Sequence, residues 1–146
     1  MAVVSAIAAS ACGGSATGGA DPLAGRYYAP EGVVIGGYDP VAYFTEGRPV
    51  KGQPAFIAVY DEATFWFASG ENRDRFLADP PSYVPRYGGF CAYGLSEGYK
   101  ATTEPDAFTV FEGRLYLNYN RDVRELWNQD RSGRIARADR HWPAIR

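Results

Sequence analysis

Apolar and polar positions alternate in two pairs of short segments, and these pairs predict two β-hairpins. F-I-A-V-Y at 56–60 and F-W-F-A at 65–68 flank the polar break D-E-A-T. F-T-V-F at 108–111 and L-Y-L-N-Y at 115–119 flank Glu112-Gly113. Aromatic and β-branched residues on both sides of a short polar turn are typical of paired strands.

A helix is predicted after each hairpin. Ser69 is suited to cap the first helix, and Pro80 and Pro81 end it. The second helix covers 120–127 and has its apolar residues on one side, at Val123, Leu126 and Trp127. Both helices carry an Asn-Arg-Asp triplet near the start. Apolar faces of hairpins and helices must be buried against each other, so we expect an α+β fold in which two β-hairpin-plus-helix (ββα) halves pack as one small domain.

Two further segments have recognisable patterns. The stretch 86–106, between the halves, has glycine at 88, 89, 94 and 98, which predicts unusual backbone conformations or close approach of other atoms. The stretch 131–146 alternates basic and apolar residues. It predicts a helix that ends at Pro143 and docks through Trp142.

The N-terminal segment differs from the rest of the chain. Residues 1–12 carry no charge and residues 13–20 are rich in glycine, serine and alanine, which is typical of an export signal followed by a linker. We therefore divide the chain into a leader and linker, 1–25, and a domain, 26–146. A-S-A-C at 9–12 resembles a lipoprotein processing site, with Cys12 as the lipidated residue. A plain secretory signal or a tail is the alternative. We expect an exported protein, periplasmic or anchored to the membrane only through Cys12.

Composition limits the available chemistry. The 146 residues carry a net charge of −2, which gives no electrostatic reason to expect nucleic acid as a partner. Aromatic residues make up 15% of the chain, so the core must be built largely from them. Outside the leader, Cys91 is the only cysteine and His141 the only histidine. Few side chains therefore remain for soft-metal binding or for catalysis near neutral pH.

Several separated motifs together resemble the YHS-domain proteins of bacteria, in their longer exported branch. The motifs are G-Y-D-P-V-A-Y-F at 37–44, F-W-F-A-S-G-E-N-R-D-R-F-L-A-D-P-P-S-Y at 65–83, Y-G-G-F-C-A-Y-G at 87–94 and I-A-R-A-D-R-H-W-P at 135–143. The shorter relatives in that group are regarded as metal-binding modules. The resemblance places their three metal-binding thiolates at Ala42, Ala68 and Asn72 of this chain. Methyl groups cannot bind a metal and a carboxamide is a poor ligand for Cu(I), so the resemblance implies the scaffold without its metal site.

The remaining candidates give three functional hypotheses. The first is an exported, non-enzymatic binding protein of the cell envelope that holds a soft metal such as copper through Cys91 and His141, because thiolate and imidazole suit Cu(I). The second is a metal-free module that binds a small molecule or a protein in a tyrosine-rich pocket near Cys91, walled by Tyr87, Phe90 and Tyr93. The third, less favoured, is a thiol-dependent enzyme.

Each of these residues also has a structural interpretation. Cys91 is equally typical of a buried core position, and His141 of a solvated basic segment. Asp39 and Glu97 are candidates for an acid/base pair or for oxygen ligands of a hard cation. We favour a turn-forming role for Asp39 and a solvated loop for Glu97.

Overall fold

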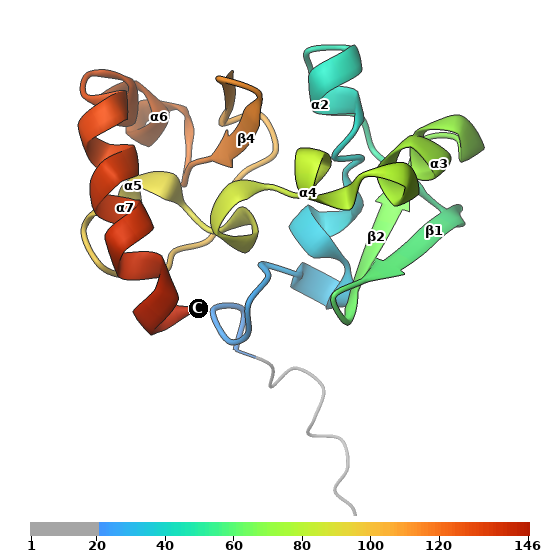
Figure 1. The fold of residues 1–146 in the computed structure, drawn as a ribbon, viewed down its shortest axis with the longest axis horizontal. Helices are drawn as coiled ribbons and strands as arrows, with labels where there is room; N and C mark the ends of the chain where they lie inside the picture. Colours follow the sequence, from blue (N-terminus) through green and yellow to red (C-terminus); the bar gives the residue numbers. More distant parts are fainter. Residues whose placement is uncertain (1–20) are drawn as a thin grey trace, which may run out of the picture.

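The computed structural model describes residues 21–146 and contains two antiparallel hairpins, each followed by helices. β1 (Gln53–Tyr60) pairs with β2 (Ala63–Phe67), and α3 (Gly70–Ala78) follows. β3 (Phe108–Phe111) pairs with β4 (Arg114–Leu117), and α6 (Arg121–Asn128) follows. Figure 1 shows the two units side by side. The predicted α+β fold with two ββα halves is confirmed.

Short helical segments precede and connect the hairpins. The first half begins with η2 (Pro30–Gly32), η3 (Val34–Gly37) and α2 (Ala42–Thr45). The second half is introduced by α4 (Pro80–Tyr83), η4 (Arg86–Gly89) and α5 (Ala92–Ser96). The long α7 (Arg131–Ile145) closes the chain and packs along α5. Of these segments, η3 packs against β2 and η4 against β4, and η3 and η4 contact each other.

Both hairpins turn through two residues with positive φ. These residues are Asp61 and Glu62 in the first hairpin (φ 55° and 64°) and Glu112 and Gly113 in the second (φ 51° and 75°). Positive φ at both central positions matches the right-handed twist of the flanking strands. The predicted break at 61–64 is therefore two residues too long, because β2 already begins at Ala63.

Polar side chains cap the helices that follow the hairpins. Ser69 Oγ accepts a hydrogen bond from Asn72 N–H (3.1 Å), so the predicted cap is confirmed. Asn120 Oδ1 caps α6 by accepting from Val123 N–H (2.9 Å). The two Asn-Arg-Asp triplets therefore hold different places, because Asn72 lies inside α3 whereas Asn120 precedes α6. Their identity does not reflect an equivalent helix start.

Helix α7 continues beyond the predicted end at Pro143. It runs to Ile145, and Arg146 N–H still donates to Trp142 O (2.9 Å). A proline in a helix lacks its own N–H donor and crowds the carbonyl four residues before it, but Pro143 stands in the last turn, so only two helical residues follow the disturbance. Trp142 packs on the second core cluster, as predicted, with its ring 6.0 Å from that of Tyr87 and 6.3 Å from that of Phe90.

The core consists of two clusters that meet at β4. Leu115 and Leu117 belong to the cluster formed mainly by buried side chains of the first half, whereas Tyr116 belongs to the cluster around Trp127. Successive side chains of a strand point to opposite faces, so one short strand supplies both clusters. Neither half buries its apolar face alone.

The two halves repeat one local structure. Gly36-Gly37 and Gly88-Gly89 each lie in a 3-10 turn with positive φ, and each turn leads to an aromatic residue and a short helix. After the aromatic residue, Asp39 N–H donates to Val50 O (2.8 Å), as Cys91 N–H does to Ala101 O (3.0 Å). The positive φ of Gly88, Gly89 and Gly98 confirms the unusual backbone predicted for 86–106, and the Gly36-Gly37 turn repeats this conformation in the first half.

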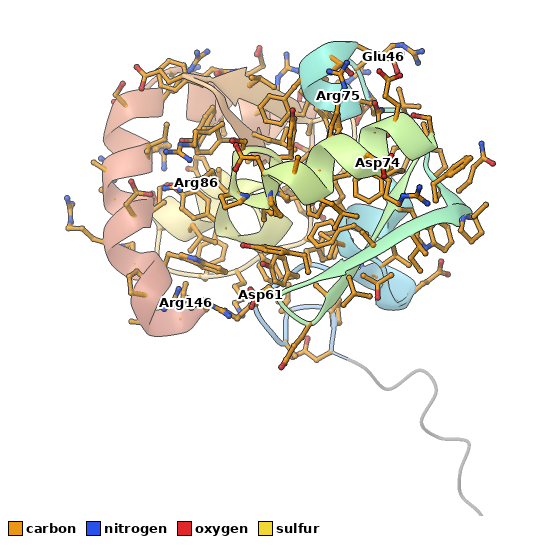
Figure 2. The ribbon with its side chains drawn as sticks, turned by 45° about the vertical axis from the view of Figure 1, so that its right-hand side comes forward. Glu46, Asp61, Asp74, Arg75, Arg86 and Arg146 are labelled. Carbon is orange, nitrogen blue, oxygen red and sulfur yellow. The ribbon has the colours of Figure 1, made fainter. Side chains whose placement is uncertain are left out.

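Apart from the buried Asp39, the charged side chains lie at exposed or partly exposed positions in both halves. Figure 2 labels examples from Glu46, beside α2, to Arg146, after α7. Among residues 21–146, no helix is both long and apolar enough to cross a membrane.

Candidate ligand pocket and the cysteine region

Cys91 is a buried, free cysteine that caps α5. It is 2% exposed, and its Sγ accepts a hydrogen bond from Gly94 N–H (3.4 Å). The thiol also donates to Asn118 Oδ1 (3.5 Å), and the same oxygen accepts from Tyr93 N–H (2.9 Å). The sulfur therefore ties the start of α5 to the end of β4.

Burial raises the pKa of the Cys91 thiol, and backbone N–H groups around the sulfur oppose this only in part. A thiolate is the form that attacks electrophiles and binds metals. The environment of Cys91 therefore favours a protonated, unreactive thiol.

His141 lies at the other end of α5. Its imidazole faces Gly98, where a Cβ would stand 3.6 Å from Cε1, whereas Cys91 precedes the first turn of that helix. His141 is exposed and Cys91 is buried. In the described part of the chain, no group of three or more His, Cys, Asp or Glu side chains is arranged to hold a metal ion.

The three positions that the family resemblance assigns to thiolates converge on the carboxylate of Asp39. Its Oδ1 accepts from Val41 N–H (2.8 Å) and Ala42 N–H (3.2 Å). Its Oδ2 accepts from Ala68 N–H (2.8 Å) and from Asn72 Nδ2 (2.8 Å). Asp39 is 0% exposed, so these four donors take the place of water.

Asp39 and Cys91 occupy equivalent places in the two halves. Each follows a Gly-Gly-aromatic sequence, each accepts from backbone at the start of a short helix, and each reaches the residue after the second strand of its hairpin. The turn-forming interpretation of Asp39 agrees with these contacts. Glu97 is exposed and lies in the second half, where it pairs with Arg134 (2.9 Å). It therefore does not join Asp39, in the first half, in a carboxylate pair.

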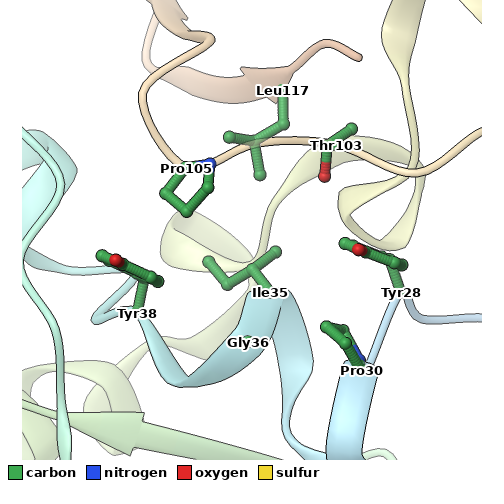
Figure 3. A pocket seen from close by; sticks show the side chains of 8 residues that line it. All are labelled: Tyr28, Pro30, Ile35, Gly36, Tyr38, Thr103, Pro105 and Leu117. Atoms are coloured by element: carbon green, nitrogen blue, oxygen red, sulfur yellow. The ribbon is translucent and has the colours of Figure 1, made fainter. Parts of the chain in front are cut away.

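A pocket of about 100 Å³ opens where the two halves meet (Figure 3). Its floor is made by Ile35 of η3 and Leu117 of β4, both almost fully buried. The rings of Tyr28 and Tyr38 stand on opposite sides of it in Figure 3. The other lining residues are Pro30, Gly36, Thr103 and Pro105. Leu117 also forms an isolated β-bridge with Cys91, so the pocket lies next to the backbone contact between these two residues.

Hydrogen bonds and packing fix the walls of this pocket. Thr103 Oγ1 donates to Gly89 O (2.8 Å), and the buried Tyr43 hydroxyl donates to Pro105 O (2.8 Å). The Tyr28 ring packs against Phe90 with centroids 6.0 Å apart. Desolvation raises the pKa of Tyr28, so its hydroxyl stays protonated and can donate to a ligand.

Ile35 carries an unfavourable backbone conformation at the pocket floor. Its φ of 49° lies in the left-handed region, which a β-branched residue rarely adopts. Such strain persists only where the surrounding structure holds it in place, and it is frequent at binding sites. The strained turn directs Ile35 toward Leu117 and so completes the floor.

The pocket is not walled by the aromatic residues that the sequence suggested. Tyr87 and Phe90 are buried in the second core cluster, and Tyr93 lies under the Arg134 guanidinium, 3.8 Å from its ring centre. Tyr87 also borders a separate cleft of about 210 Å³. The lining residues Tyr28 and Tyr38 were missed because their meeting with Leu117 depends on how the halves pack. In the sequence, the Gly36-Gly37 pair next to Tyr38 was the one feature that could have pointed to this pocket.

Cys12 lies outside the described residues. Comparison of the chain with family models, with curated proteins and with solved structures gave no match. The resemblance to YHS-domain proteins and the expected export therefore stay predictions.

Proposed function

We propose that this protein is a non-enzymatic binding protein that holds a small, largely apolar ligand without a metal in the pocket between its halves. The observation that carries the proposal is the open apolar site formed by Ile35, Leu117 and two tyrosine rings from segments far apart in the sequence. Ligand sites are concave, mostly apolar, and have a few polar groups that orient the ligand.

The size of the pocket limits the ligand. A buried cavity of about 150 Å³ holds benzene, so about 100 Å³ that opens at a rim suits a short branched chain or part of one ring. Ligands of about five to nine heavy atoms bind in a site of this kind at roughly −4 to −6 kcal/mol, which is a dissociation constant between about 1 mM and tens of micromolar.

A chemical-shift titration tests the proposal. Benzyl alcohol and isobutanol should shift the amide resonances of Gly36, Tyr38 and Thr103 in a saturable way. Leu117→Phe, which puts a larger side chain in the floor and takes up space for the ligand, should weaken binding at least about tenfold. Leu126→Phe makes the same change at an exposed site on α6 and should leave binding unchanged. Absence of saturable shifts at those three amides in the wild type would contradict the proposal.

The copper hypothesis is tested alongside. Cu(I) is titrated into the wild type, Cys91→Ser and His141→Ala in competition with a chromophoric chelator. Strong competition by the wild type that both substitutions abolish would favour copper binding over the metal-free pocket. The buried, protonated thiol and the exposed imidazole at opposite ends of α5 lead us to expect no competition.

A further inference from the structure

Lys51 places a positive charge at the edge of the pocket. Its Nζ donates to Gly36 O (2.8 Å) and lies 5.0 Å from the ring centre of Tyr38. Gly36 and Tyr38 both line the pocket. Tyr38 and Lys51 are also bridge partners, so the backbone places Lys51 directly beside Tyr38.

Within residues 21–146, this charge has no acidic partner in an ion pair. All nine ion pairs found among residues 21–146 are made by arginine, and none includes Lys51. None of the residues that line the pocket is acidic. Gly36 O accepts one hydrogen bond from the ammonium, which leaves two N–H donors of this exposed cation for a ligand.

Lys100, the other lysine of the chain, also lies near an aromatic ring but has a different environment from Lys51. Lys100 lies 4.8 Å from the ring centre of Phe90, the counterpart of Tyr38. Its Nζ, however, contacts Gly25 O, and desolvation lowers its pKa. Lys100 is thus used to hold the N-terminal part of the domain, whereas Lys51 is exposed beside an open pocket.

We infer that the ligand of this pocket is a small carboxylate with an apolar body. The inference rests on the proposed function and names the class of ligand. The apolar body would contact Ile35 and Leu117, and the carboxylate would accept from Lys51 Nζ. The hydroxyls of Tyr28 and Tyr38 are further donors at the rim, and an ammonium ligand would be repelled by Lys51.

Matched neutral and anionic ligands test the inference on the full chain. Benzoate is compared with benzyl alcohol, and isobutyrate with isobutanol, by the same amide titration. Each carboxylate should bind about three- to tenfold more tightly than its alcohol, and this preference should decrease with added salt. Lys51→Met should abolish the preference, and Lys51→Arg should retain it.

Arg48→Met is the control for net charge. Arg48 is exposed, pairs with Glu46 (2.8 Å) and does not line the pocket, so its loss removes one positive charge three residues before Lys51 without changing the pocket. The carboxylate preference should survive this change. Equal binding of alcohol and carboxylate, or a preference that Lys51→Met leaves intact, overturns the inference but not the proposed function. Failure of both ligand types to bind overturns the proposed function and the inference with it.

Discussion

At the scale of single residues, Asp39 is the acceptor on which the first half depends. Four donors from three separate segments end on one carboxylate that solvent does not reach. The Asn72 carboxamide therefore has a role that a thiolate could not fill, because it donates a hydrogen bond to Asp39 and a thiolate has no proton to donate. In the second half Cys91 holds the corresponding place with weaker hydrogen bonds.

Replacing Asp39 should be severe. Asp39→Ala leaves buried N–H groups of Val41, Ala42 and Ala68 without an acceptor, so the free energy of unfolding should fall by about 3–4 kcal/mol. Urea unfolding followed by circular dichroism measures this. Asp74→Ala, at an exposed carboxylate, should change it by less than about 0.5 kcal/mol. Similar costs for the two variants would contradict the role given to Asp39.

At the scale of elements, the Gly-Gly turns set the position of each short helix. In η4 the backbone approaches residue 26 so closely that a Cβ on Gly88 would stand 1.8 Å from Arg26 O. Tyr28 N–H then donates to Gly88 O (2.9 Å), which brings Tyr28 to the pocket wall. The turn therefore connects the local backbone to the site.

This close approach gives a prediction about glycine. Gly88→Ala should lower the free energy of unfolding by about 3 kcal/mol or more, because backbone atoms must move to admit the methyl group. Gly47 has a similar φ (+70° against +63°) but nothing within 4 Å of a built Cβ. Gly47→Ala should therefore cost only about 1 kcal/mol, from backbone strain alone. Thermal and urea unfolding of the two variants provide the measurement, and equal costs would refute the steric account.

At the scale of the whole molecule, the two halves depend on each other. The alternate faces of β4 supply both core clusters, and the pocket takes walls from both halves. Burial that both halves share also raises the pKa of several hydroxyl and thiol groups, among them Cys91, Tyr43 and Tyr87. These groups stay protonated in the folded protein at pH values where the unfolded chain has lost its protons.

Stability should accordingly fall at alkaline pH. The contribution of these raised pKa values is complete below about pH 8.5, where even an unfolded cysteine is protonated. It decreases as pH rises further, first through Cys91 and above about pH 10 through the tyrosines. Urea midpoints between pH 7 and pH 11 measure this, and Cys91→Ala should delay the onset to about pH 10. A midpoint that is constant up to pH 11 would show that burial does not shift these groups.

The sequence by itself determined the local elements, because strand and helix patterns, the Ser69 cap and the Glu112-Gly113 turn depend on neighbouring residues. It also identified Cys91 as a core candidate and Asp39 as a turn residue. Only the tertiary structure decided which segments meet: that Ala42, Ala68 and Asn72 surround Asp39, that Cys91 and His141 lie at opposite ends of one helix, and that Tyr28, Ile35 and Leu117 form a pocket. Such contacts join residues tens of positions apart. They are set by how two apolar faces pack together, and a pattern of neighbouring residues carries no information about that packing.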